Sequence, residues 1–327
     1  MSQTDISICS IEQTIEQTIA SGQKTISIDK EKCREFIIAL ISNNRLDLLI
    51  KLYSVISFNL DFYATPFDVC DIAARHGFLD IVKWFHFERN GSLHYEREFN
   101  VCGTAAKHGF LDIILWVRNH KHSNGRCKCY FDSDLGDLHD EDNILFEAIR
   151  GNQFHIVQWV HDDRDPRILN NNMCIYAAQH GNFEILKWAV DFGYPLSPAV
   201  ASCLAYGGFF DILKWVCSVG CTYDVLTCAM AANGGHLDIL QWLRSINCPW
   251  DEQTTYYAAL NARLDILKWA VENGCDIRKT IKFGCPNIRK NYIVLGKPVS
   301  HGAALSGSID VMSWLREIGC EWDELTC

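Results

Sequence analysis

The sequence lacks long apolar runs and an excess of basic residues, and its first residues lack the pattern expected of a secretory signal. No run approaches 18 apolar residues, so we expect no membrane-spanning helix and no membrane association. The first residues, Met1 to Asp5, form no basic region and lead into no apolar stretch, so they predict no secretory signal. The net charge is −10, and a general nucleic-acid-binding role requires a basic surface. We therefore expect a cytoplasmic protein that binds neither a membrane nor nucleic acid.

The sequence also lacks the short motifs that mark common active sites. There is no phosphate-binding glycine loop, no G-x-S-x-G and no H-E-x-x-H. Most His, Asp and Cys residues recur in register with a repeat, which indicates a structural role. We therefore expect no enzyme, and we expect no cofactor.

One eight-residue segment recurs along the chain. Gly235 to Trp242 reads G-H-L-D-I-L-Q-W. Near copies begin at residues 77, 109, 181, 208, 262 and 307, and more divergent copies begin at residues 44 and 152. Nine copies indicate a repeat protein.

Each copy predicts the junction between two short helices. A pair of small residues such as Ala231-Ala232 ends the first helix, and small side chains let neighbouring helices approach closely. The Gly position requires a left-handed backbone, which Gly and Asn tolerate, whereas Ala262 costs about 1 kcal/mol there. The acidic residue three positions later lies in the first turn of the second helix, where negative charge is favourable. Leu237, Ile239, Leu240 and Trp242 form the apolar face of that helix, so the recurring Trp is expected in the core.

These residues carry a resemblance to a known family. The pattern A-A-x-x-G-H-L-D-I-L is similar to the ankyrin repeat, over residues 33–327, although the T-P-L-H start of that repeat is almost absent. The spacing of the recurring Trp falls to 27 residues between Trp188 and Trp269, which leaves little room there for the β-hairpin finger of an ankyrin repeat. The resemblance implies an all-α, ankyrin-like helical solenoid of about nine helix pairs with short or missing hairpin fingers, and any residual hairpins are expected before Trp159. The Trp-rich shortened form, with segments such as Cys248-Pro249-Trp250-Asp251-Glu252, looks like the ankyrin proteins of large DNA viruses that infect amoebae. A viral protein of this kind would act in the host cell cytoplasm.

The chain divides into an N-terminal segment and a repeat array. Residues 1–32 are expected to form a cap or arm. Residues 33–327 form the array, with polar insertions at residues 119–142 and 278–298. At the C-terminal end we expect Val311, Met312 and Trp314 to offer an apolar face that self-associates or is covered by a partner.

The sixteen cysteines suggest buried residues in a reducing compartment rather than a disulfide framework. Four of them recur six residues after a repeat Trp: Cys221, Cys248, Cys275 and Cys320. The first insertion holds a group that does not follow the repeat. It comprises His120, His122, Cys127 and Cys129, with His139 further on. Sulfur and imidazole ligands suit zinc, but a flexible polar insertion is the alternative interpretation.

The leading functional hypothesis is a protein–protein interaction scaffold that takes part in host interaction. Its alternatives are a substrate adaptor for a ubiquitin ligase, by analogy with viral ankyrin proteins, and a metal-binding protein that uses the 119–142 insertion. The partner is expected along the exposed face of the first helices, at Arg75, His76, Lys107, His108, Arg150, Tyr176, Gln179, Tyr206, Met230, Asn233 and Tyr257. The cations among these residues either bind an acidic partner segment or only complement the helix dipoles.

Overall fold

A computed structural model describes residues 8–20, 30–55, 66–88, 101–119, 141–162, 172–275, 277, 299–320 and 322. These residues form nineteen α-helices, and no strand occurs among them. The prediction of an all-α protein is confirmed for this part of the chain. The chain forms two compact units, Met1–Pro166 and Arg167–Cys327, and each is described by itself. Residues 120–140 and 278–298, which make up most of the two insertions, lie outside the described residues, as do the segments before Trp159 in which hairpins are expected.

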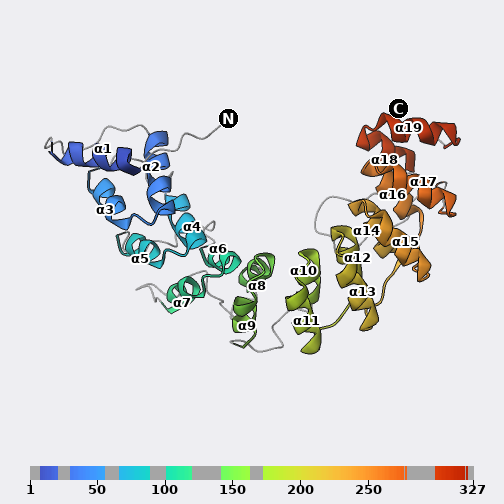
Figure 1. The fold of residues 1–327 in the computed structure, drawn as a ribbon, viewed down its shortest axis with the longest axis horizontal. Coiled ribbons are helices and arrows are strands. Elements are labelled where there is room, and N and C mark those ends of the chain that lie inside the picture. The colour runs from blue at the N-terminus through green and yellow to red at the C-terminus, as the bar shows by residue number, and fades with distance from the viewer. Residues whose placement is uncertain are drawn as a thin grey trace. The chain divides into compact units, whose positions relative to one another are not determined.

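The first unit contains one N-terminal helix and four helix pairs (Figure 1). The helices are α1 (Ile8–Ala20), α2 (Lys30–Ser42), α3 (Leu46–Val55), α4 (Pro66–His76), α5 (Leu79–Glu88), α6 (Val101–His108), α7 (Leu111–Asn119), α8 (Glu141–Arg150) and α9 (Phe154–Asp162). Within each pair the second helix packs against the first, and the first helices α2, α4, α6 and α8 pack against one another in succession.

The second unit contains five more pairs built in the same way (Figure 1). The helices are α10 (Met173–Gln179), α11 (Phe183–Asp191), α12 (Pro198–Gly207), α13 (Phe210–Ser218), α14 (Val225–Gly234), α15 (Leu237–Ser245), α16 (Glu252–Leu260), α17 (Leu264–Glu272), α18 (Val299–Ser306) and α19 (Ile309–Glu317). Again the first helices α10, α12, α14, α16 and α18 pack in succession. Residues 172–275 consist of helices and short turns, as the 27-residue spacing predicts.

The junction predicted for each pair is confirmed. All nine turn residues have a positive φ: Asn44, Gly77, Gly109, Asn152, Gly181, Gly208, Gly235, Ala262 and Gly307. The residue after the turn then donates its N–H to the helix, as from Phe78 to the Ala73 carbonyl at 2.9 Å, which satisfies one of the last carbonyl groups. The chain therefore reverses tightly between the two helices of a pair.

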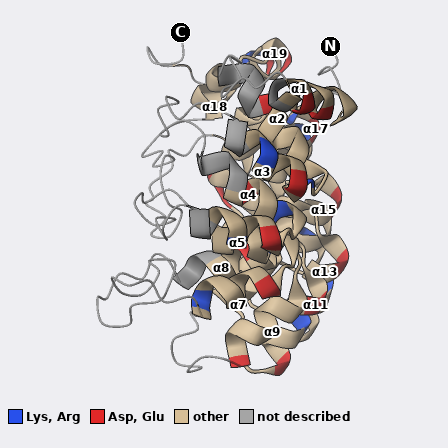
Figure 2. Ribbon diagram, turned by 90° about the vertical axis from the view of Figure 1, so that its left-hand side faces the viewer, with Lys and Arg blue, Asp and Glu red and all other residues tan. Residues whose placement is uncertain are grey.

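An acidic residue lies in the first turn of the second helix of every pair, except in α9, where His155 takes its place, as the sequence predicts. Asp80 and Asp211 stand in the first turns of α5 and α13, and both are largely exposed. Lys83 and Lys214 pair with them at 4.0 Å and 3.5 Å, one helical turn away. Figure 2 shows acidic residues recurring along the second helices.

The core differs from the prediction at the recurring Trp. Ile239 and Leu240 of α15 are buried, but Trp242 is only half-buried. Its ring packs edge-on against Phe210, at the start of the preceding second helix, with centroids 5.6 Å apart. Phe183 and Trp215 make the same contact one repeat earlier, at 5.1 Å. The expectation of a core Trp is therefore wrong, because the indole lies at the outer edge of the helix layer and connects neighbouring pairs there.

Three of the four recurring cysteines connect the two ends of a helix pair in the second unit, whereas Cys320 is half-buried. Cys221, Cys248 and Cys275 are at most 5% exposed, and the described cysteines are free thiols. The Cys248 backbone N–H donates to the Leu243 carbonyl at 2.9 Å, while its thiol donates to the Asp224 carbonyl at 3.5 Å. Asp224 is the residue that caps the start of α14. The cysteine thus joins the end of the second helix of a pair to the beginning of the first helix, and the prediction of a small buried residue is confirmed at these three positions.

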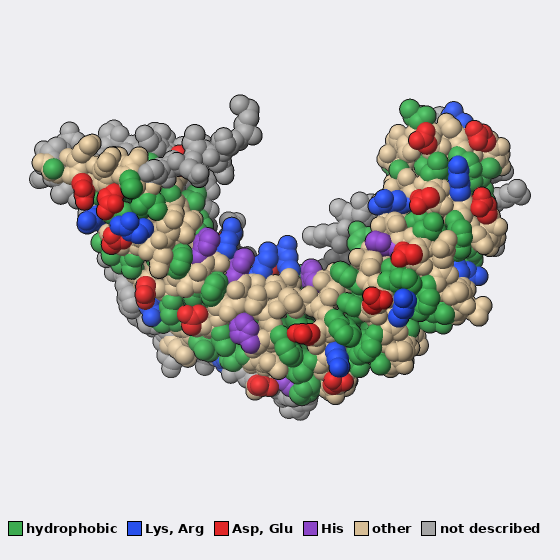
Figure 3. All heavy atoms as spheres, viewed as in Figure 1, with side chains coloured by type: hydrophobic (Ala, Val, Ile, Leu, Met, Phe, Trp, Pro, Cys, Tyr) green, Lys and Arg blue, Asp and Glu red, His purple; other side chains and the backbone are tan. Residues whose placement is uncertain are grey.

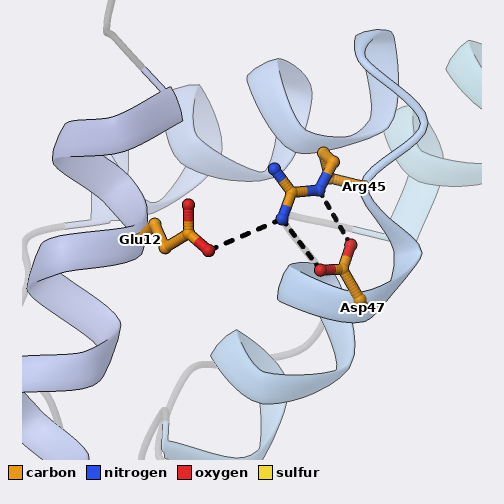
Figure 4. Close-up of polar contacts among 3 residues, drawn as sticks. All are labelled: Glu12, Arg45 and Asp47. Atoms are coloured by element: carbon orange, nitrogen blue, oxygen red, sulfur yellow. Dashed lines mark hydrogen bonds and ion pairs between the residues drawn. The ribbon is translucent and has the colours of Figure 1, made fainter.

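Helix α1 packs against α2 and α3 at one end of the first unit. Ile11 and Ile15 are completely buried there. Figure 4 shows the polar contact beside them, in which Arg45 pairs with Glu12 at 3.6 Å and makes two hydrogen bonds to Asp47, at 2.9 Å and 2.8 Å. The hydrogen bond from Arg45 lowers the pKa of Asp47 to about 2. An apolar contact and a surface ion pair therefore fix α1 to the first helix pair.

In the second unit, the prediction of an apolar face at Val311, Met312 and Trp314 of α19 is wrong at Val311. Val311 is completely buried, and Met312 and Trp314 are half-buried. Val311 points into its own helix pair because it lies one turn from Leu315, which is also buried. The exposed apolar residue of α19 is instead Ile309, with 74% of its surface accessible. Self-association through this end stays a prediction.

Candidate interaction surface

Five basic or imidazole side chains lie at the ends of three successive first helices in the first unit. Arg75 and His76 end α4, Lys107 and His108 end α6, and Arg150 ends α8. We call these five residues the cation stripe. All but Lys107, which is half-buried, are classed as exposed, and the Arg75 and Arg150 side chains retain 53% and 49% of their accessible surface. Figure 3 shows Lys, Arg and His side chains gathered over α4, α6 and α8.

Direct packing of the three helices brings the cation stripe together. The Thr104 hydroxyl of α6 donates a hydrogen bond to the Asp71 carboxylate of α4. A Cβ on Gly151, the residue after Arg150, would lie 1.8 Å from the Lys107 carbonyl oxygen, so only glycine permits this approach of α8 to α6. The turn residue Gly77 is likewise covered by the ring of Phe110 from the next pair. The C-terminal ends of α4, α6 and α8, which carry the cation stripe, therefore belong to helices that pack directly on one another.

The electrostatics of the stripe follow from this packing. Partial burial lowers the pKa of His108, and the charges of Lys107 and Arg75 lower it further, while Asp71 opposes them. His108 therefore lies in a net positive field. Two cations also have partners on their own helices. Arg75 pairs with Asp71 at 3.2 Å, and Arg150 pairs with Glu147 at 3.3 Å.

The other predicted surface residues belong to the second unit. Gln179 is exposed, Tyr206 is 54% exposed, and Tyr176, Asn233 and Tyr257 are half-buried. A residue that the prediction missed adds to them, because Asn261 donates its side-chain amide to the Asn233 side-chain oxygen at 2.8 Å, across α14 and α16. Asn261 occupies the position just before the turn residue, which is the same position as His76 and His108, so the repeat alignment could have identified it.

Met230 is the exception among the predicted surface residues. Its side chain is only 9% exposed, so the expectation that it faces a partner is wrong. It precedes the buried pair Ala231 and Ala232 on α14, and the neighbouring first helices α12 and α16 pack on both sides of this helix. The Met230 sulfur accepts a hydrogen bond from the Asn233 side-chain amide at 3.9 Å.

The proposed metal ligands cannot be placed. His120, His122, Cys127, Cys129 and His139 all lie outside the described residues. Within the described ranges, no group of three or more His, Cys, Asp or Glu side chains could hold a metal ion. Burial raises the pKa of the Cys174 and Cys221 thiols to about 11, so both sulfurs are protonated at neutral pH in the metal-free protein.

No protein-family model matches the chain, and no curated protein matches it. Among the described helices, none is both long enough and apolar enough to cross a membrane.

Proposed function

We propose that the chain is an ankyrin-type repeat protein whose cation stripe binds an acidic segment of a partner protein. The nine helix pairs, each with a left-handed turn, support the repeat assignment. In residues 172–275 short turns alone connect the helices, as expected for the shortened, Trp-rich form of viral ankyrin proteins. On that resemblance, the protein is a non-catalytic scaffold for host interaction in the cytoplasm of an infected cell.

One observation carries the functional part of the proposal. Arg75, Lys107 and Arg150 occupy the same repeat position on three helices that pack in succession. A row of cations on a chain with net charge −10 is a local reversal of sign. Such a surface attracts an acidic partner and repels a basic one. Complementing three helix dipoles would also place cations here, but it would not require Arg75, on the neighbouring helix, to lie close enough to His108 to help lower its pKa.

The test is binding of a fluorescent peptide of ten glutamates, measured by anisotropy at low and high salt. The variant reverses three charges of the stripe, Arg75→Glu, Lys107→Glu and Arg150→Glu. Each exposed ion pair contributes about 0.2–1 kcal/mol, and reversal adds repulsion, so we expect at least about tenfold weaker binding. Wild-type binding should also weaken as salt rises, because at ~0.1 M the screening length is about 10 Å.

The matched control reverses three charges on second helices, Lys51→Glu, Lys83→Glu and Lys214→Glu. These lysines lie on α3, α5 and α13, away from the ends of the first helices. The control has the same net charge as the stripe variant and should keep most of the wild-type affinity. Equal losses in both variants would show that only net charge matters, and the proposal would then be wrong.

A further inference from the structure

The spacing of the cation stripe limits the conformation of the segment that it can bind. Helices that pack directly have axes about 8–10 Å apart. The Thr104–Asp71 hydrogen bond and the close approach of Gly151 to Lys107 show that α4, α6 and α8 pack directly. Equivalent side chains on these helices therefore recur at about the same interval, along a line that crosses the helices.

Two regular conformations, the polyproline II helix and the α-helix, present side chains at about that interval and on one side, and a short isolated α-helix is only marginally stable in water. A β-strand alternates faces, so its same-face side chains recur about every 6.6 or 13 Å, which does not match. A polyproline II helix has three residues per turn and rises about 3.1 Å per residue. Every third side chain of such a segment thus lies on one side, about 9.3 Å from the next.

We propose that the bound segment is a polyproline II helix with an acidic residue at every third position. This inference rests on the proposed function and specifies its partner. The three carboxylates of such a segment would meet Arg75, Lys107 and Arg150 in order. A polyproline II segment has no internal hydrogen bonds and little conformational freedom when rich in proline, so it loses little entropy on binding.

The existing ion pairs leave donors for the segment. Arg75 uses one terminal nitrogen for Asp71, and Arg150 uses one for Glu147. A guanidinium has five N–H donors, and about half of each side chain is exposed. Asp71 and Glu147 orient the two arginines, but their charges also compete with the carboxylates of the segment.

This competition provides a variant that should gain affinity. Asp71→Asn removes one negative charge and retains a side-chain oxygen that can accept the hydrogen bond from the Thr104 hydroxyl. We expect the variant to bind the acidic segment more tightly than the wild type by a factor of about two to five, as for one surface ion pair. A residue with a purely structural role would instead lose affinity or stability when it is changed.

The experiment compares three labelled peptides with equal numbers of glutamates on the full chain. The first repeats Glu-Pro-Pro three times, the second has the same composition with its three glutamates adjacent, and the third is an alanine-rich helix with glutamates every seven residues. The helix also places charges about 10.5 Å apart on nearly one side, so it tests conformation rather than spacing. Circular dichroism checks the fold of each variant.

We expect the spaced proline peptide to bind about tenfold more tightly than the clustered one, the preference corresponding to about 1.4 kcal/mol. We also expect the stripe charge-reversal variant to lose that preference. Equal binding of the two proline peptides, or tighter binding of the helix, would overturn the polyproline II inference. If the ten-glutamate peptide still binds through the stripe, the proposed function stands in either case. If that peptide does not bind the wild type at all, the proposed function itself is wrong, and this inference with it.

Discussion

Two Ala→Gly substitutions three residues apart should change stability in opposite directions. Ala262 is the turn residue between α16 and α17, with φ of 55°, and its side chain is exposed. An L-residue in the left-handed region costs about 1–2 kcal/mol, and the greater unfolded-state freedom of glycine offsets about 0.5–1 kcal/mol of this. We therefore expect Ala262→Gly to raise the free energy of unfolding by about 0.5–1 kcal/mol.

The matched control is Ala259→Gly on α16. Ala259 is completely buried and helical, so the change loses helix propensity of about 1 kcal/mol and a buried methyl worth about 0.8 kcal/mol. We expect destabilisation of about 1–2 kcal/mol. Urea unfolding followed by Trp fluorescence measures both free energies of unfolding. The two values can be compared if the free energy of unfolding depends on urea concentration with the same slope in each variant. Hydrogen exchange of α16 and α17 amides localises the effect. If both substitutions destabilise, Ala262 does not have a left-handed backbone.

Three further perturbations test other parts of the structure. In urea unfolding, Leu240→Ala should lower the free energy of unfolding by about 2–5 kcal/mol, because Leu240 is a core residue. Trp242→Ala should lower it by only about 2 kcal/mol, because the indole is half-buried. A larger loss at Trp242 would place this side chain in the core. Arg45→Gln should increase hydrogen exchange in α1 without affecting the second unit, and unchanged exchange in α1 would show that its apolar contact alone fixes it. Affinity for the ten-glutamate peptide should rise as the pH falls from 7.5 to 5.5, because the pKa of His108 in the free protein lies below its usual value and a bound carboxylate raises this pKa. The His108→Gln variant should lose the part of the rise that depends on His108. The same pH profile in that variant would show that His108 does not contribute.

Much of the local structure was predictable because it depends on residues close in sequence. The left-handed turns, the small residues before them and the acidic first turns all follow from backbone geometry and helix electrostatics. A turn such as Gly235 is fixed by its own sequence, whatever packs around it. The same reasoning predicted Arg75, Lys107 and Arg150 at one repeat position.

The errors concern contacts between repeats, which a single repeat does not specify. Trp242 has the apolar character of a core residue, but its place at the outer edge depends on Phe210 of the preceding pair. Met230 aligns with the half-buried Tyr176 and Tyr257, yet it is only 9% exposed. The hydrogen bond from the Cys248 thiol to the Asp224 carbonyl likewise joins residues 24 positions apart. Periodicity identifies equivalent positions, but burial depends on the residues that neighbouring repeats place against them.

The most direct test of the cation stripe is carbodiimide cross-linking of the ten-glutamate peptide to the full chain. The reagent joins a carboxylate to a lysine amine in contact with it, and mass spectrometry identifies the lysine. Lys107 is the lysine of the stripe, whereas Lys83 and Lys214 lie on second helices beside acidic residues and retain 36% and 45% of their accessible side-chain surface. We predict that the peptide cross-links to Lys107 and that the yield falls as salt rises. Cross-links at Lys83 or Lys214 with none at Lys107 would show that the acidic segment binds elsewhere.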